Sequence, residues 1–145
     1  MPLQGTYEPS PVQWVRDQVA EYESSKGRRG TTMRGMPVIV LTTAGRTSGN
    51  LRKSPLMRVV HDGDYAAVAS VGGAPEHPAW YHNLVAHPAC TVQDGPTISD
   101  RVARELEGAE REEWWARCVE AFPDYAEYET RTDRIIPVML LERDD

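Results

Sequence analysis

The segment GRTSGNLRKSP, residues 45–55, gathers side chains that are suited to holding an anion. Its two glycines allow sharp turns that expose backbone N–H groups, and Thr47 and Ser48 add hydroxyl donors. Arg46 and Arg52 can each make paired hydrogen bonds to a phosphate or a carboxylate. This composition predicts a phosphate-binding loop, although a polar hairpin on a basic surface has a similar pattern. The segment matches neither Walker A nor GxGxxG, which argues against ATP and a Rossmann-bound nucleotide.

A flat apolar side chain and an amide occur together in HPAWYHNL, residues 77–84. Trp80 and Asn83 are three residues apart, so they share a face if this segment is a helix. An indole wall and an amide that can bond a ring carbonyl would together suit a heteroaromatic ligand. The alternative, with Trp80 in the core and Asn83 capping locally, is equally consistent with the sequence.

Aromatic residues recur at intervals of three in FPDYAEY, where Phe122, Tyr125 and Tyr128 form a stripe. Such a stripe more often packs inside a core. It can also cover a pocket, and a tyrosine hydroxyl is then available as a hydrogen-bond or proton donor.

The histidines and cysteines do not predict a metal site or a nucleophile. His77, His82 and His87 are five residues apart, which separates successive side chains by about 140° around a helix. Cys90 and Cys118 form no CxxC pair and are expected to be buried. The chain has no GxSxG elbow. We therefore expect no metal.

Charge is distributed unevenly along the chain. The net charge is −6, but residues 1–60 hold nine Lys or Arg against four Asp or Glu, so this part is +5 and the remainder −11. Eight cations lie between Glu23 and Asp62, where there is no carboxylate. This segment is expected to carry a positive potential and to attract an anionic ligand. A solvated basic face without a ligand is the alternative.

Several classes of partner are disfavoured. The acidic remainder, and the lack of aromatic residues among the cations from Lys26 to Arg58, argue against nucleic acid. No apolar run approaches the roughly 18 residues that span a bilayer, and no leader pattern is present, so we expect a cytoplasmic protein. Asp17, Glu21 and Glu23 would be repelled by anionic lipids, so peripheral membrane contact is not expected.

Local patterns predict the following elements. A helix over 10–26 begins with Ser10 as N-cap, Pro11 at the first position and Gln13 closing a capping box. The other helices are predicted at 79–86, 109–121 and 124–130, and the strands at 37–43, 51–61, 65–70, 89–93, 97–105 and 136–141. Consecutive strands with tight turns exclude a parallel sheet, which needs a crossover after each strand.

The chain length of 145 residues favours one domain. We divide it into a flexible arm at 1–9, an N-terminal helix at 10–26 and a core at 37–145. The predicted fold class is α+β, a small, mostly antiparallel barrel with flanking helices.

Four segments together resemble the deazaflavin-dependent nitroreductase family of actinobacteria. They are TTAGRTSG at 42–49 with Arg52 and Pro55, ASVGG at 69–73, PAWYHNL at 78–84, and residues 125–137 with TDR at 132–134. The similarity runs in order, at matching spacings, from about Pro37 to Leu140. The resemblance implies a split β-barrel related to FMN-binding oxidases. It also implies binding of coenzyme F420, a deazaflavin whose tail carries a phosphate and several glutamates.

The resemblance assigns the candidate residues to two parts of this cofactor. Its phosphate and tail would lie against Arg46, Thr47, Ser48, Arg52, Lys53 and Ser54. Its ring would be lined by Pro55, Leu56, Met57, Val68, Ala69, Ser70, Val71, Ala79, Trp80, Tyr81 and Asn83. Three positions depart from the family pattern: Val71, where lysine is frequent, and Met57 and Phe122, where tyrosines are frequent. These departures concern the acceptor more than the cofactor.

The resemblance implies a reductase that transfers hydride from reduced F420 to a small-molecule acceptor, which is a quinone, an activated enone or a nitroaromatic. Tyr125, Tyr128 and Ser70 are the candidate catalytic residues, and the proton comes from water or a tyrosine hydroxyl. The alternatives are an F420-binding or storage protein without turnover, and an FMN-binding split-barrel oxidoreductase. The sequence does not distinguish a monomer from a dimer.

Overall fold

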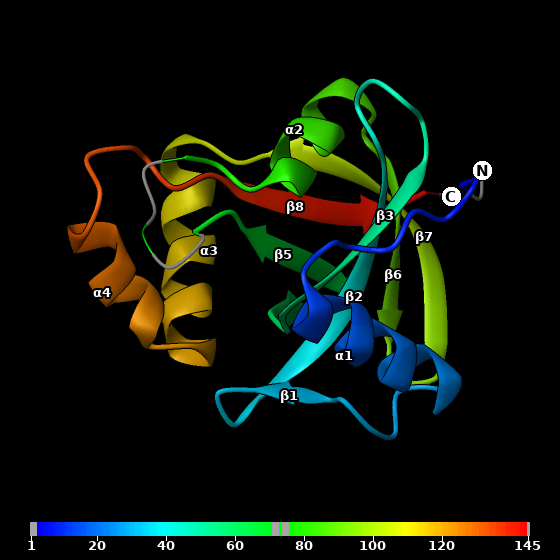
Figure 1. Cartoon of the computed structure of the whole chain (residues 1–145). Helices are drawn as coiled ribbons and strands as arrows, with labels where there is room; N and C mark the ends of the chain where they lie inside the picture. Colours follow the sequence, from blue (N-terminus) through cyan, green and yellow to red (C-terminus); the bar gives the residue numbers. More distant parts are fainter. Residues whose placement is uncertain (1–2, 71–72, 74–75, 145) are drawn as a thin grey trace.

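The computed structural model describes residues 3–70, 73 and 76–144. A strongly curled sheet forms an open barrel, and helices pack around it (Figure 1). The strands are β1 (Thr32–Met33), β2 (Met36–Ala44), β3 (Leu51–Met57), β4 (Val60–His61), β5 (Asp64–Val68), β6 (Ala89–Asp94), β7 (Thr97–Glu105) and β8 (Val138–Arg143). The helices are α1 (Gln13–Ser24), α2 (Ala79–Ala86), α3 (Gly108–Ala121) and α4 (Asp124–Thr130).

All paired strands of the described sheet run antiparallel. Their order is β1-β2-β6-β7-β8-β5-β4, and β3 pairs with β2 off this path. Helix α1 packs on β3, α2 on β2, α3 on β5 and β8, and α4 on α3 (Figure 1). The predicted fold class, α+β with a mostly antiparallel split barrel and flanking helices, is therefore confirmed.

The core has two halves because β2 is buried on both faces. Successive side chains of a strand point to opposite sides, so Val38 and Val40 enter one apolar cluster while Ile39 and Leu41 enter the other. Full burial of one such side chain contributes about 1.5–3 kcal/mol. Strand β2 buries all four of these side chains and pairs with β1, β3 and β6, so it is central to the fold. The first cluster includes Val19, Tyr22, Trp114 and Cys118, and the second includes Trp80, Leu84 and Cys90. Both cysteines are buried and free, as predicted.

Helix α1 begins later than the sequence pattern indicates. Its first residue is Gln13, and the hydroxyl oxygen of Ser10 accepts a hydrogen bond from the Val12 N–H at 3.1 Å. The predicted capping box is therefore wrong, because the chain turns before the helix starts. The helix ends at Ser24, two residues before Lys26 adopts a left-handed φ of 56°.

The predicted strand 51–61 is two strands. The ladder between β2 and β3 ends at the pair Val38 and Met57, next to Pro37, which has no N–H to donate. The chain then turns, and β4 pairs with β5, whose longer partner is β8. The last strand begins at Val138, two residues later than predicted. Helices 79–86 and 124–130 are confirmed with their predicted bounds.

The N-terminal arm lies along β3. Leu51 donates its N–H to the Thr6 carbonyl at 2.8 Å and accepts a hydrogen bond from the Glu8 N–H at 2.9 Å. Residues 6–8, which we expected to belong to a flexible segment, are thus held on the barrel next to the phosphate-binding loop predicted from the sequence. In the described part of the chain, no helix is long and apolar enough to cross a bilayer.

Candidate active site

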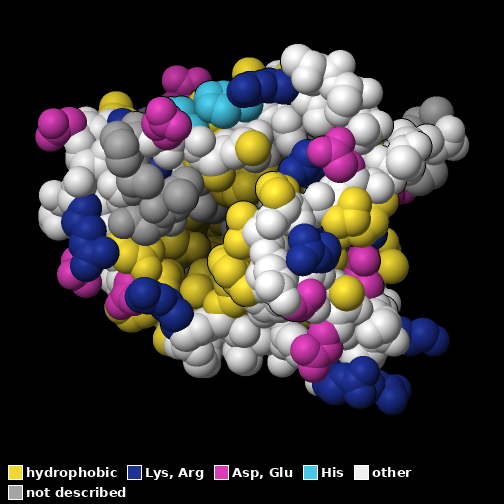
Figure 2. Space-filling view, viewed as in Figure 1, with side chains coloured by type: hydrophobic (Ala, Val, Ile, Leu, Met, Phe, Trp, Pro, Cys, Tyr) yellow, Lys and Arg dark blue, Asp and Glu magenta, His cyan; other side chains and the backbone are white. Residues whose placement is uncertain are grey.

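Two cavities adjoin between α1, the barrel and α4. We call them the apolar cavity, of about 650 Å³, and the polar cavity, of about 520 Å³. Four residues line both: Val15, Ser54, Pro78 and Trp80. Figure 2 shows the hollow near the centre of this face, floored by hydrophobic side chains, with Lys or Arg along part of its rim. The two cavities therefore form one elongated site with chemically different ends.

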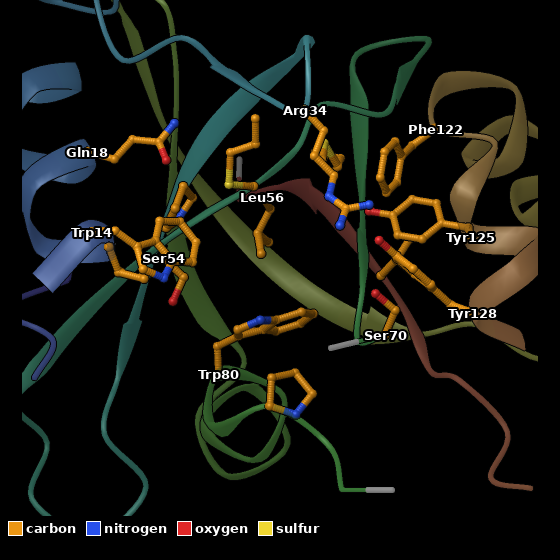
Figure 3. Close-up of a pocket in the computed structure, with 16 residues that line it drawn as sticks. Trp14, Gln18, Arg34, Ser54, Leu56, Ser70, Trp80, Phe122, Tyr125 and Tyr128 are labelled. Carbon is orange, nitrogen blue, oxygen red and sulfur yellow. The ribbon is translucent and has the colours of Figure 1, made fainter. Parts of the chain in front are cut away.

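The apolar cavity is enclosed from three directions (Figure 3). Trp80 projects from α2, Trp14 from α1, and an aromatic group comes from the end of α3 and from α4. Leu56 of β3 lies between these walls in the figure. The remaining lining residues are Val15, Gln18, Met33, Arg34, Ser54, Pro55, Met57, Val68, Ser70, Pro78, Phe122, Tyr125 and Tyr128. Such a wide, largely apolar space suits a planar ring stacked on a second planar molecule.

The polar cavity is built around the loop between β2 and β3. Gly45 donates its N–H to the Asn50 carbonyl at 2.7 Å, and Gly49 donates to the Gly45 carbonyl at 2.9 Å. Gly49 has a φ of 74°, which L residues with a side chain rarely adopt. The structure brings all six predicted tail residues to this cavity, namely Arg46, Thr47, Ser48, Arg52, Lys53 and Ser54.

Asn83 holds this loop against helix α2. Its Oδ1 accepts a hydrogen bond from the Arg46 N–H at 3.0 Å, and its Nδ2 donates to Oγ1 of Thr43 at 3.1 Å. Asn83 also lines the polar cavity. Both ends of the amide have partners inside the protein, so the side chain fixes the shape of the loop. The structure therefore combines the two alternatives that the sequence left open. Trp80 is buried in the core and also lines both cavities, and Asn83 has partners inside the protein and also lines the polar cavity.

The predicted excess of positive charge is largely compensated by carboxylates that are distant in sequence. Arg52 pairs with Glu8 at 2.6 Å, and Lys53 pairs with Glu23. Among the described residues, none forms a hydrogen bond or ion pair with the side chain of Arg46. Arg46 is therefore the cation in the polar cavity that is most available to a ligand. Further pairs join Arg29, Arg34 and Arg58 to Glu21, Asp124 and Asp94.

The aromatic stripe belongs to the core and also lines the site. Phe122 and Tyr125 meet edge to face with ring centroids 5.0 Å apart, and Tyr125 and Tyr128 at 6.2 Å. Both tyrosines are less than a tenth exposed, and both line the apolar cavity. Burial raises the pKa of Tyr125, so its hydroxyl stays protonated at neutral pH. Within the described chain, neither hydroxyl has a hydrogen-bond partner.

Ser70 lies where the end of β5 meets the loop after α4. Its carbonyl accepts a hydrogen bond from Nη2 of Arg134 at 2.7 Å, while Nη1 of Arg134 lies 2.9 Å from Nδ1 of His77. Arg134 therefore joins both ends of the segment that connects β5 to α2. Arg134 belongs to the TDR segment at 132–134 that carries the family resemblance, but the sequence predicted no role for it.

Two residues that were predicted to contact the ring, Ala69 and Tyr81, are not among the described residues that line either cavity. Ala69 is completely buried in the second core cluster, because it points away from its neighbours Val68 and Ser70. Tyr81 is about 100° from Trp80 around α2 and donates its hydroxyl to Glu105 at 2.6 Å. Val71 lies outside the described residues. Of the other predicted ring residues, Ala79 and Asn83 line only the polar cavity, and the rest line the apolar cavity.

Helix α1 and the β1–β2 turn also contribute to the site, which was not predicted from the sequence. Trp14, Val15 and Gln18 of α1 and Met33 and Arg34 near the turn all line the apolar cavity. The signal in the sequence was Trp14 itself, a large aromatic residue next to Val15 in the predicted helix. In the structure its side chain is 58% exposed and lines the cavity, whereas Tyr22 of the same helix is buried. No group of three His, Cys, Asp or Glu side chains among the described residues is arranged to hold a metal ion.

The barrel alone places the chain among split-barrel folds. A structure described as a putative pyridoxamine 5'-phosphate oxidase from Listeria innocua aligns over 89% of this chain and 92% of its own, with a TM-score of 0.51 at 12% identity. The sequence identifies the family more closely than the fold does. The sequence model of the family described as F420H(2)-dependent quinone reductase matches residues 14–143. The chain belongs to this family.

Similar proteins cover most of the chain. An F420H(2)-dependent quinone reductase of Mycobacterium tuberculosis strain H37Rv is 34% identical over 139 residues, 91% of each chain. A structure described as an F420-H2 dependent reductase is 57% identical over 73% of this chain and 94% of its own, with a TM-score of 0.70. One described as a domain-swapped dimer is 51% identical over 92% of this chain and 100% of its own, at 0.73.

Proposed function

We propose that this protein transfers hydride from reduced coenzyme F420 to a small quinone. When bound, the cofactor would supply the redox chemistry by giving a hydride to the quinone and a proton to the solvent, and the quinone would take one proton from water or a tyrosine hydroxyl to become a hydroquinone. The observation that carries the proposal is the sharing of Ser54 and Trp80 by the apolar and polar cavities. A ligand with a flat ring and an anionic tail matches this continuous site, and F420 is such a molecule.

The residues present fit the cofactor at both ends. Thr47 and Ser48 offer hydroxyl donors, and Arg46 has a side chain without a partner in the described chain. Charge-assisted hydrogen bonds of this kind are the stronger ones in proteins. Leu56, Met57 and Val68 would orient the ring against Trp80 and keep water from it.

The aromatic stripe would serve the acceptor side of the ring. Hydride addition to a quinone creates a negative oxygen, which a nearby donor stabilises. Tyr125 and Tyr128 present hydroxyls without partners in the described chain, at the edge of the same cavity. We assign them, with Ser70, to holding the acceptor and supplying the hydrogen bond or proton.

Nitroaromatics and activated enones belong to the same proposal as secondary acceptors. Both can accept hydride, and the apolar cavity has room for a flat molecule of their size. Met57 and Phe122 line the cavity where tyrosines are frequent in the nitroreductases that the sequence resembles. This difference removes two hydroxyl donors, so we expect quinones to be reduced faster than nitroimidazoles.

The rival function is storage or shielding of F420 without turnover. Steady-state oxidation of reduced F420 with menadione, corrected for the reaction without protein, distinguishes the two. Acceleration by the protein supports the reductase, and tight binding without acceleration supports storage. FMN binding that equals or exceeds F420 binding would favour the FMN-dependent alternative. The proposal includes a cytoplasmic location, to be tested by cell fractionation, and sedimentation will distinguish a monomer from a dimer.

A further inference from the structure

Arg34 is the one charged side chain among the described residues that line the apolar cavity. It is absent from the described lining of the polar cavity, where the cations of the β2–β3 loop lie. In Figure 3 it extends from the β1–β2 turn toward the aromatic side of the site. Its charge therefore acts on whatever occupies the apolar end, at the side opposite the proposed tail.

The turn that carries Arg34 has a defined shape. Arg34 and Gly35 have φ values of 51° and 77°, and together they join the paired residues Met33 and Met36. Positive φ at both central residues is the pattern of a type I′ turn, which matches the twist of a hairpin. The backbone thus fixes the position from which the arginine reaches the cavity.

The guanidinium is held by a replaceable partner. Nη1 of Arg34 lies 2.9 Å from Oδ2 of Asp124, the first residue of α4. The two side chains are 65% and 40% exposed, so water competes for both. Exposed pairs of this kind contribute little to stability, so an anionic group of a ligand can replace the carboxylate at small cost.

We infer that Arg34 makes the site prefer acceptors that carry an anionic substituent, such as a sulfonate or carboxylate on the quinone ring. This inference rests on the proposed function. The ring would enter the apolar cavity, and its substituent would replace Asp124 as the partner of the guanidinium. A neutral quinone leaves the Arg34–Asp124 pair as it is and gains nothing from it. The preference is therefore a property of one exposed charge pair beside the apolar cavity.

The test compares two acceptors that differ by one charge. Oxidation of reduced F420 is measured with 1,4-naphthoquinone and with 1,4-naphthoquinone-2-sulfonate, each corrected for the rate without protein. The quantity of interest is the kcat/KM ratio, sulfonate over neutral, because any general loss of activity affects both substrates and cancels. Differences in reactivity between the quinones also cancel when variants are compared with the wild type.

Two substitutions are expected to move this ratio in opposite directions. Asp124→Asn frees Arg34 and is expected to raise the ratio about three- to fivefold, the size of one exposed ion pair. Arg34→Gln removes the cation, leaves Asp124 uncompensated, and is expected to lower the ratio by a similar factor. Arg34→Lys keeps the charge and is expected to stay close to the wild-type ratio. Salt should reduce all of these differences.

Arg29→Gln is the matched control. Arg29 also forms an exposed ion pair, with Glu21 at 3.7 Å, but it lines neither cavity as described. This variant is expected to keep the wild-type ratio. If it shifts the ratio as Arg34→Gln does, a long-range charge effect explains the data and the inference is overturned.

Failure of this inference differs from failure of the proposed function. A wild-type protein that does not accelerate oxidation by neutral naphthoquinone contradicts the reductase itself. If the neutral quinone is reduced but Arg34→Gln and Asp124→Asn both keep the wild-type ratio, the reductase stands and the role of Arg34 is wrong. Melting temperatures establish that each variant is folded, and Asp124→Asn provides the answer if Arg34→Gln does not fold.

Discussion

The Nδ2 of Asn83 donates a hydrogen bond to Oγ1 of Thr43 at 3.1 Å, and both side chains are buried. The same asparagine accepts the N–H of Arg46 at 3.0 Å. Helix α2, which carries Trp80, is thereby tied to the loop that lines the polar cavity. One buried amide sets the relative position of the ring wall and the anion-binding loop.

Asn83→Ala is expected to weaken F420 binding and to lower stability by about 1–3 kcal/mol, because it leaves buried polar groups without partners. Thr43→Val is the control, since it removes the bond to Nδ2 but keeps the bond to the Arg46 N–H. The control is expected to lose stability but to keep most of its cofactor affinity. Chemical denaturation and an F420 titration measure the two effects. If Asn83→Ala and Thr43→Val bind F420 with the same affinity, Asn83 does not position the loop for the cofactor.

Arg46→Ala is expected to weaken F420 binding about tenfold or more, the value of one charge-assisted hydrogen bond. Its melting temperature should hardly change, because the side chain has no partner in the described chain. Arg52→Ala should also weaken binding, but it additionally releases Glu8 and the arm. Arg28→Ala, an exposed cation outside both described linings, is the control for charge alone. If Arg46→Ala and Arg28→Ala bind F420 equally well, the tail lies elsewhere.

F420 is expected to bind more tightly than FMN, because the polar cavity offers contacts to a long polyanionic tail. FMN has only one phosphate. The affinity for F420 should fall more steeply as salt rises, since exposed charges are screened over about 8 Å at physiological ionic strength. Parallel titrations of both cofactors at several salt concentrations measure this. Identical salt slopes would mean that the tail is not held by charge.

Tyr128→Phe is expected to lower kcat with a quinone while leaving the melting temperature and F420 affinity close to wild type. The ring keeps its contacts with Phe122 and Tyr125, and only the hydroxyl at the cavity is lost. Tyr128→Ala should instead cost about 3 kcal/mol of stability, because it empties a core position. An unchanged kcat in Tyr128→Phe would restrict this residue to packing.

Stability is expected to fall as pH rises above about 10, partly through Tyr65. Burial, with the hydrogen bond that its hydroxyl donates to Asp94 at 2.6 Å, raises the pKa of Tyr65 to about 12. Above pH 10 the unfolded chain loses this proton before the folded chain does, so unfolding becomes easier. The contribution is complete below pH 10 and is lost as pH rises toward about 12.

The control for this alkaline effect is Tyr65→Phe, measured by urea unfolding between about pH 9 and pH 11.5. It should be less stable than wild type at pH 9, where the bond to Asp94 is intact in the wild type. The difference between the two proteins should then narrow as pH rises. A constant difference across the range would show that the Tyr65 proton is not linked to folding.

Much of the fold and part of the site follow from short-range patterns. The continuous, β-branched apolar run from Val38 to Leu41 predicts a buried strand, and the glycines and hydroxyls at 45–49 predict a turn that exposes N–H donors. Pro78 at one end and His87-Pro88 at the other define helix 79–86, so its bounds were predictable. These signals are local, since each depends on the φ and ψ preferences of a few neighbouring residues.

The tertiary structure decided which distant groups meet. No local pattern places Glu8 beside Arg52, Glu23 beside Lys53 or Asp124 beside Arg34, and these pairs determine which cations remain available to a ligand. The wall that α1 contributes through Trp14 depends equally on how the helix packs on β3. The sequence alone determined which chemical groups the chain carries and which strands and turns hold them. The directions in which those groups point, and the partners they find, depend on contacts between residues far apart in the sequence. No short segment determines the energies of such contacts.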